Sequence, residues 1–473
     1  MGKMTNNIVQ NPAVIRKIHI LKTLNESNRI TPSEELANQL QCTTRTIKND
    51  IAQLNQTLPI SWRVLGIASR GYVLEKNPED KISYVIAPYL KQSEIYRILQ
   101  GIYDYKNYTW IKWSQILYID KLTLKKMFIK FVKTLKHFEL DFNFKTLQLV
   151  GEELNIRYFY IVLFYNIQKY KNTIHLPSHL QRKIERIIEL YEVEIDLNIL
   201  MIIISVCLKR TMNKDFINKN LNVNFKFNNN KLKCIESIIL EIERAYDTIL
   251  HPNEKQFLLQ SLLLISQVDI KEKRYITNYY CEFHKKSYTE YNSLLETISY
   301  IYKLNSIVKE KILYDLYFQL YKIHTLKKFN LSTKYLLDEH KDLYKNHPEL
   351  IDIYNVITPL FTSYNKKKIE NKLTEDELNY IMFNMVCNIY LNEKKKKVLL
   401  LLSGPEIWKN FIYSKLNNEL GNVINLNTEN TDKFEFIITN YNIINGATPI
   451  IQISDKMPQK DVENIKKFLR VTN

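Results

Sequence analysis

The sequence predicts a mainly α-helical, multidomain protein that ends in a small α/β domain. Apolar residues recur at helical spacing along most of the 473 residues. Near the N-terminus, three helical patterns followed by two short β-prone runs occur twice in succession. Residues 394–473 instead alternate strand-like and helix-like segments. A chain of this length is expected to form several domains of roughly 100–200 residues each.

The first N-terminal unit opens with a helical pattern over Pro12–Asn25. A short second helix is expected over Ser33–Leu40. We expect Thr31 to cap this helix, because Thr31 and Glu34 have the spacing of a capping box and Pro32 suits the first helical position.

A third helix is predicted after a turn at Gln41–Thr43, and it runs to about Thr57, ahead of Pro59. Two β-prone runs within residues 62–76 then flank Ser69-Arg70-Gly71, a pattern typical of a hairpin. Three helices followed by a hairpin indicate a winged helix-turn-helix (HTH) unit, to which we assign residues 1–80.

Residues 81–165 repeat this order and predict a second, more diverged winged helix. Helices are expected near Ser93–Tyr103, Thr109–Tyr118 and Leu122–Phe138, and residues 142–151 alternate like a pair of strands. At 100° per residue, one half of the third helix carries six lysines. They are Lys121, Lys125, Lys126, Lys130, Lys133 and Lys136.

Residues 166–393 read as helical almost throughout. Residues 251–262 and 374–385 echo each other, since each places a polar turn and a Glu at a helix start before an apolar run. This echo predicts two homologous all-helical domains, 166–275 and 276–393.

The last segment, residues 394–473, predicts a small parallel α/β domain. A basic run leads into a buried-type strand that ends at Gly404-Pro405. The remaining elements are a helix over Glu406–Leu420, strands near 422–427, 434–439 and 449–454, and a closing helix over Asp461–Val471.

Charge is concentrated near the N-terminus. The chain carries a net charge of +17, and residues 1–150 hold 22 Lys and Arg against 12 Asp and Glu, a net charge of +10. Such a basic segment favours a polyanion, because Lys and Arg displace counterions from a phosphate backbone. Generic solubility in a lysine-rich protein is the alternative.

Several functional classes are disfavoured. Only eight glycines are present, and no glycine-rich phosphate loop occurs, which argues against a nucleotide-dependent enzyme. The histidines form no metal-binding pattern, and no catalytic motif is present, so we expect no cofactor, metal or catalytic residue. Five scattered cysteines, no apolar run near 20 residues and no visible secretory signal predict a cytoplasmic protein without membrane contact.

The third helix of the first unit is the strongest candidate for a DNA contact. Ile47, Ile51 and Leu54 form an apolar stripe, and Arg45, Lys48 and Asn49 lie on the opposite face. In a major groove, Arg can contact guanine and Asn can contact adenine. A solvated polar face without a ligand is the alternative reading for this helix, and also for the lysine face of the second unit.

The remaining contacts are assigned by position. Thr43, Thr44 and Thr46 lie at the start of the helix, where hydroxyl and backbone N–H groups suit phosphates, and Arg70 at the hairpin tip suits a phosphate or the minor groove. The predicted DNA-binding residues are Thr43, Thr44, Arg45, Thr46, Lys48, Asn49 and Arg70, with Lys121, Lys125, Lys126, Lys130 and Lys133 from the second unit.

The order of these parts resembles the Mga/AtxA-type transcriptional regulators of Gram-positive bacteria. The residues that carry the resemblance are PSEELANQLQCTTRTIKNDIAQLN (32–55), RGYVL (70–74), VGEELNIRYF (150–159), LHPNEKQFLLQSLLLI (250–265) and IIQIS (450–454). The resemblance implies two DNA-binding winged helices, two phosphotransferase-system regulation domains (PRDs) and a C-terminal domain like enzyme IIB. It implies an activator of virulence-type genes that binds double-stranded DNA and can contact phosphotransferase-system proteins.

The chain departs from the family at the phosphorylated positions. The pattern would place histidines at Ser261 and Asn384, and the loop Ser403-Gly404-Pro405 lacks the phospho-cysteine of enzyme IIB. Which residue, if any, is phosphorylated stays open. We therefore expect the C-terminal half to mediate homodimer formation, which would supply paired half-sites. The alternatives are a PRD-containing RNA-binding antiterminator and, as an enzyme, a phosphotransferase component.

Overall fold

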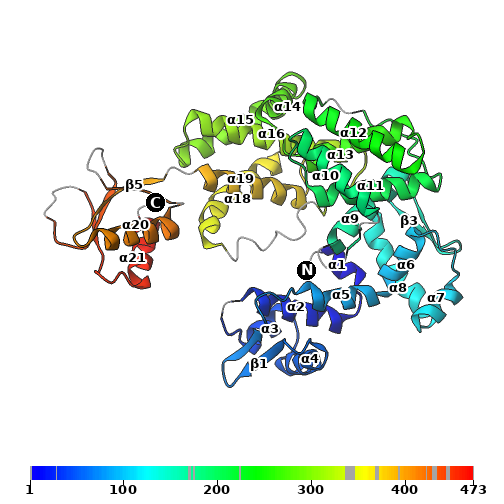
Figure 1. Ribbon diagram of the computed structural model, residues 1–473, viewed down its shortest axis with the longest axis horizontal. Helices are drawn as coiled ribbons and strands as arrows, with labels where there is room; N and C mark the ends of the chain where they lie inside the picture. The colour runs from blue at the N-terminus through cyan, green and yellow to red at the C-terminus, as the bar shows by residue number, and fades with distance from the viewer. Residues whose placement is uncertain are drawn as a thin grey trace. The chain divides into compact units, whose positions relative to one another are not determined.

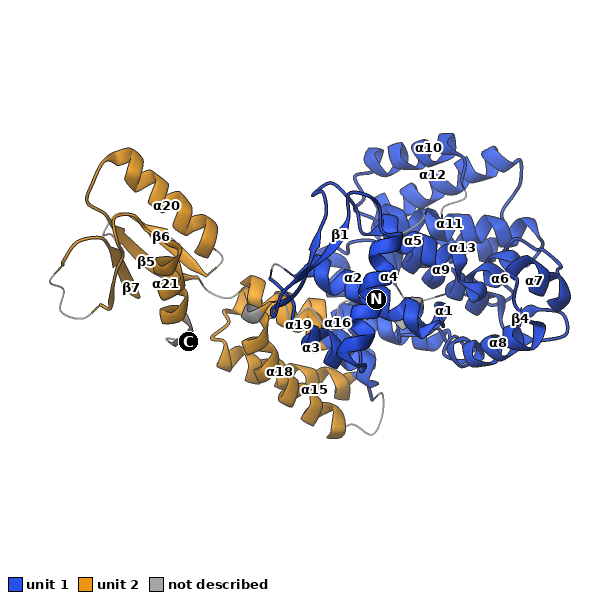
Figure 2. Cartoon of the chain, turned by 90° about the horizontal axis from the view of Figure 1, so that it is seen from below, with its two compact units in different colours: residues 1–284, 317–346, 370–381 blue, residues 285–316, 347–369, 382–473 orange. Residues whose placement is uncertain are grey.

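The structure is a computed structural model. It describes residues 3–27, 29–168, 172–173, 176–222, 225–335, 347–367, 372–392, 395–421, 423–428, 434–443 and 448–471. Helices dominate, and the first of them form helix-turn-helix units, so the mainly helical fold with N-terminal HTH domains is confirmed (Figure 1). The chain divides into two compact units, residues 1–284, 317–346 and 370–381, and residues 285–316, 347–369 and 382–473 (Figure 2).

The first winged helix follows a short helix, α1 (Lys3–Ile8). Its elements pack around a core that includes Leu21, Leu36, Ile47, Leu54 and Trp62. Strands β1 and β2 are antiparallel, and Ile67 faces Gly71 at the turn, as the hairpin prediction requires. The elements are α2 (Pro12–Glu26), α3 (Ser33–Gln39), α4 (Thr44–Thr57), β1 (Arg63–Ile67) and β2 (Gly71–Glu75).

The predicted capping box at Thr31 is wrong. Pro32 is the N-cap of α3, and no side chain caps that end. Thr31 instead pairs with β2 through its backbone: its N–H donates to the Tyr72 carbonyl at 2.9 Å, and the Tyr72 N–H donates to the Thr31 carbonyl at 2.8 Å. A Cβ at Gly71, whose φ is +129°, would overlap the Thr31 carbonyl oxygen. Long-range strand pairing therefore replaces the local cap.

The second winged helix has an aromatic core. Trp110, Phe128, Phe131 and Phe142 are buried, and Trp110 and Phe128 meet edge to face with ring centroids 5.7 Å apart. Met4 and Ile8 of α1 belong to the same core, a contribution that the sequence did not indicate. Helix α5 (Ser83–Gln92) comes before this unit, and its buried residues Val85, Ile86 and Leu90 pack with residues of α2 and with Val9 instead. The elements of the second winged helix are α6 (Glu94–Tyr103), α7 (Trp110–Leu117), α8 (Lys121–Lys136), β3 (Asp141–Asn143) and β4 (Gln148–Val150).

The middle of the chain is helical, as expected. The two echoed segments begin α13 and α19, and the third residue of each helix is a buried glutamate, Glu254 and Glu377. Helices α16 and α19 contribute residues to both compact units. The helices are α9 (Glu153–Gln168), α10 (Ser178–Leu190), α11 (Leu197–Met212), α12 (Asn229–Tyr246), α13 (Pro252–Ile265), α14 (Ile270–Phe283), α15 (Lys285–Ile301), α16 (Ser306–Lys328), α18 (Pro348–Lys367) and α19 (Glu375–Asn392).

The C-terminal segment forms a four-stranded sheet in the order β6-β5-β7-β8, with every neighbouring pair parallel. Parallel neighbours require long crossovers, and α20 supplies the one between β5 and β6. Val398, Leu416, Phe436 and Ile465 are among the residues of its core. The elements are β5 (Lys396–Leu401), α20 (Glu406–Leu420), β6 (Ile424–Asn427), β7 (Phe436–Thr439), β8 (Ile450–Gln452) and α21 (Gln459–Val471).

Candidate nucleic-acid interface

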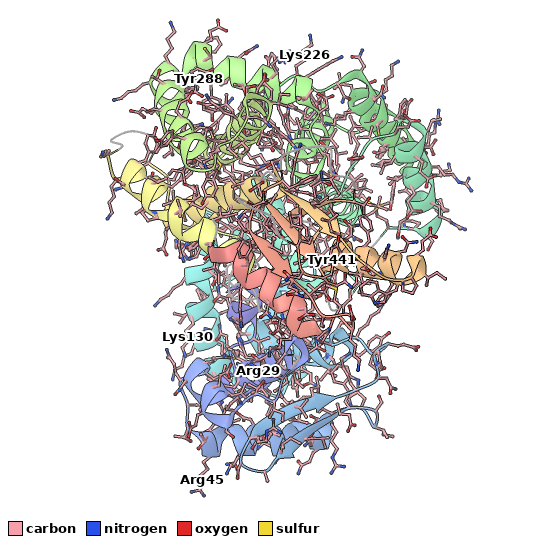
Figure 3. The ribbon with its side chains drawn as sticks, turned by 90° about the vertical axis from the view of Figure 1, so that its left-hand side faces the viewer. Arg29, Arg45, Lys130, Lys226, Tyr288 and Tyr441 are labelled. Carbon is pink, nitrogen blue, oxygen red and sulfur yellow. The ribbon has the colours of Figure 1, made fainter. Side chains whose placement is uncertain are left out.

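Helix α4 separates its apolar and polar residues as the sequence predicts. Ile47 and Leu54 are fully buried, whereas Arg45, Lys48 and Asn49 are exposed. Within the described part of the chain, none of these three exposed side chains forms a hydrogen bond or an ion pair. Figure 3 shows Arg45 projecting away from the ribbon. The three side chains can therefore contact a ligand without breaking an existing interaction.

The start of α4 is held by threonine hydroxyls. Thr43 is the N-cap, and its Oγ1 accepts the Thr46 N–H at 3.2 Å and lies 2.9 Å from the Thr46 Oγ1. Thr44 is exposed beside this cap, whereas Thr46 is half-buried. The first backbone N–H groups of a helix have no partner within the helix and favour anions. The geometry thus gives Thr43 and Thr46 a capping role and leaves Thr44 facing solvent.

A partly buried ion pair fixes the orientation of α4 on α2. The Arg16 Nε lies 2.8 Å from Asp50 Oδ2, and the Arg16 Nη2 donates to Asp50 Oδ1 at 3.3 Å. Asp50 is nearly buried, and its hydrogen bond raises the pKa of the Arg16 guanidinium. A two-point contact of this kind restricts rotation of α4 about its axis. Sequence reasoning missed it, although a lone acid within the apolar stripe was the available signal.

The far end of α4 is joined to the hairpin. The Asn55 amide donates to the Val64 carbonyl at 2.9 Å and accepts the Val64 N–H at 2.9 Å. Arg70 is exposed in the turn between β1 and β2, where its N–H donates to the Ile67 carbonyl at 3.0 Å. Asn55 therefore sets the position of the hairpin, and of Arg70, relative to α4.

In the second unit, α8 presents the predicted lysine face. Lys126, Lys130 and Lys133 are exposed, and Lys121 and Lys125 are half-buried. Lys130 is labelled in Figure 3. These five lysines have no ion-pair partner among the residues that the structure describes. They leave a positively charged helix face free to meet a phosphate backbone.

Three features of α8 were not expected. Lys136 pairs with Asp141 at 2.6 Å and lowers the pKa of that carboxyl, so it is not free for DNA. Leu122 and Ile129 are 65% and 58% exposed beside the lysines. The carboxylate of Asp120 caps the helix by accepting the Leu122 N–H at 2.8 Å. The carboxylate of Asp120 therefore occupies the first N–H groups of α8, whereas a neutral threonine caps α4.

No group of three or more His, Cys, Asp or Glu side chains that could hold a metal ion occurs among the described residues. Over the same part of the chain, no helix has both the length and the apolar character needed to cross a membrane.

The fold and the two exposed polar helices define a tandem helix-turn-helix protein of the DNA-binding class. Residues 16–73 match the HTH domain family, and residues 78–165 match the Mga helix-turn-helix domain.

The chain is also similar to named regulators along nearly its whole length. It is 23% identical to the capsule synthesis positive regulator AcpB and to the anthrax toxin expression trans-acting positive regulator, both of Bacillus anthracis. Each comparison covers 96% of this chain and 98% of the relative. A putative trans-acting regulator of Streptococcus pneumoniae serotype 4 is 21% identical over 85% of this chain and 84% of its own length. The resemblance to the Mga/AtxA-type transcriptional regulators is confirmed.

Proposed function

We propose that this protein is a transcription activator of virulence-type genes that binds double-stranded DNA through its two N-terminal winged helices. The observation that carries the proposal is the face of α4, where Arg45, Lys48 and Asn49 are exposed and unpaired on a helix oriented by the Arg16–Asp50 ion pair. The names of the relatives, which are positive regulators of capsule synthesis and toxin expression, support activation. As a DNA-binding regulator the protein would act in the cytoplasm.

The proposed contacts divide by chemistry. Arg45 and Asn49 read base edges, Lys48 reaches a base or a phosphate, and Thr44 with the α4 N-terminus receives a phosphate. Thr43 and Thr46 hold that N-terminus in place. Arg70 contacts the backbone or minor groove beside the site. Lys121, Lys125, Lys126, Lys130 and Lys133 neutralise phosphates over a second stretch of the duplex.

We also propose that the helical middle is a pair of homologous PRD-like domains, residues 166–275 and 276–393. The two echoed glutamates support this assignment. Glu254 accepts hydrogen bonds from Arg157 and from the Ile217 N–H, and Glu377 accepts from the Thr333 hydroxyl at 2.7 Å and pairs with Lys327 at 2.8 Å. Each buried carboxylate thus ties the start of a helix to segments distant in sequence.

Residues 394–473 are proposed as an enzyme IIB-like domain that serves interaction rather than phosphate transfer. The parallel sheet supports the assignment, and the loop after β5 offers Ser403-Gly404-Pro405 in place of a cysteine. We propose that the C-terminal half forms a homodimer, which would pair two DNA half-sites. We further propose that this protein can contact phosphotransferase-system proteins.

The test is binding of the full chain to fluorescent promoter duplexes between 50 and 200 mM salt, conditions over which phosphate contacts lose much of their strength. We expect affinity above that of a charge-matched control protein and a steep fall with salt. An RNA hairpin of equal length serves as competitor. Preference for the RNA would favour the antiterminator, and affinity no higher than the control would refute the proposal.

A further inference from the structure

A pocket of about 280 Å³ lies within the first compact unit, walled by α9, α11, α13, α16 and α19. Its volume is near the lower end of the range for small-molecule sites, roughly 300–1,000 Å³. The wall is mainly aliphatic and aromatic, and it includes Ile161, Val162, Ile203, Leu263, Phe329 and Leu331. Such a wall favours a ligand with an apolar body.

One cation interrupts this apolar wall. Lys322, on α16, is half-buried, and its Nζ lies 4.5 Å from the centroid of the Phe318 ring. Within the described part of the chain it has no hydrogen-bond or ion-pair partner. Burial, and then the charge of Lys273, lower the pKa of Lys322 to about 8. A cation that is partly removed from water and has no anion beside it is destabilising, so an anion that enters the pocket gains a favourable electrostatic partner.

The other polar groups of the wall are mostly engaged. The Ser261 hydroxyl donates to the Leu258 carbonyl at 2.7 Å, and the Tyr380 hydroxyl donates to Gln319. One exception is Gln260, whose Oε1 is buried and has no hydrogen-bond partner among the described residues. Because a half-turn of the amide exchanges its oxygen and nitrogen, Gln260 can also offer an N–H donor. Lys322 and Gln260 are thus two polar groups available to a ligand.

The charge and polarity of the wall restrict the ligand class. Lys322 is the one charged residue among the described residues of the wall, so a single negative charge balances it. A sugar or nucleotide would bury many hydroxyl or phosphate groups against aliphatic side chains, which is unfavourable. An amine would meet Lys322 with the same charge.

We propose that this pocket binds a small carboxylic acid with an apolar body, with its carboxylate paired to Lys322 and its hydrocarbon part enclosed by the helices. The Gln260 amide completes the polar end by donating to the second carboxylate oxygen. This inference concerns a ligand of the helical region and does not depend on DNA binding, so it can fail while the proposed function holds.

The test is isothermal titration of the full chain with octanoate, using 1-octanol and octylamine as probes of the same length without a negative charge. We expect octanoate to bind with a stoichiometry near one per chain and at least about tenfold more tightly than 1-octanol, since hydrogen bonds to charged groups are among the strong ones. Lys322→Met should remove this preference for the acid. Lys271→Met, at an exposed lysine of α14, should leave it unchanged.

Folding of Lys322→Met is checked by thermal unfolding. We expect its melting temperature to equal or exceed that of the wild type, because the substitution removes a cation that lacks an anion. Thr325→Phe, which adds bulk to the wall and keeps Lys322, is the second variant and should abolish octanoate binding. The proposal is overturned if octanoate fails to bind, if 1-octanol binds equally well, or if either pocket variant binds octanoate like the wild type.

Discussion

Removing the carboxylate of Asp50 should loosen α4 more than any change on its exposed face. The Asp50 side chain is 6% exposed and that of Arg16 is 25% exposed. Breaking a fully buried pair by removing one partner costs about 3–5 kcal/mol. Because Arg16 keeps partial access to water, we discount this to about 2 kcal/mol for Asp50→Ala. That free energy corresponds to a fall of about 30-fold in the protection of the α4 amides.

Hydrogen exchange of the full chain, followed by mass spectrometry, measures this protection helix by helix. The double variant Arg16→Met with Asp50→Leu should recover most of the lost protection, because apolar residues can replace a buried ion pair without loss of stability. We expect its DNA affinity to stay reduced, since the two-point contact that orients α4 is missing. Unchanged protection in Asp50→Ala would refute this account of the ion pair, and full DNA affinity in the double variant would refute its orienting role.

Three further predictions concern other parts of the chain. Gly71→Ala should lower the melting temperature of the first winged helix and weaken DNA binding, because the Cβ of the new alanine would overlap the Thr31 carbonyl. An unchanged melting temperature would contradict the strand pairing at Thr31. Lys130→Ala should reduce the slope of log affinity against log salt concentration by about 1 and weaken DNA binding equally on all DNA sequences. A loss of affinity confined to one DNA sequence would instead indicate that Lys130 contacts a base. Burial raises the pKa of the Cys207 thiol to about 12. Iodoacetamide at pH 8 should therefore label the exposed Cys281 and not Cys207 in the native protein, which peptide mass mapping would measure. Rapid labelling of Cys207 would contradict its burial.

The sequence predicted those elements whose signals are local. The apolar stripe of α4 follows from the spacing of Ile47, Ile51 and Leu54, and the hairpin follows from β-prone runs around Ser69-Arg70-Gly71. The parallel sheet followed from strands that alternate with helices. In each case residues that are neighbours in sequence determine the pattern, so periodicity was sufficient.

Features that depend on distant residues were missed. Arg16 and Asp50 are 34 positions apart, and the partner of Thr31 lies on β2, so no local pattern joins either pair. At Thr31 the local capping signal was misleading, because the backbone of Thr31 pairs with Tyr72 of β2 and its side chain does not cap α3. The exposure of Leu122 and Ile129 depends on how α8 packs. The pocket around Lys322 needs five helices from residues 153–392, and their assembly is invisible in the linear sequence.

The central claim, that the α4 face reads DNA bases, is tested most directly by the specificity of Arg45→Ala. Binding of the full chain to a promoter duplex and to a scrambled duplex is compared for the wild type, Arg45→Ala and the control Lys271→Ala. A lost bidentate contact to a base should weaken promoter binding by about 1–3 kcal/mol and narrow the difference between the two duplexes, whereas Lys271→Ala should change neither. Equal weakening on both duplexes, or no weakening, would contradict base reading by Arg45.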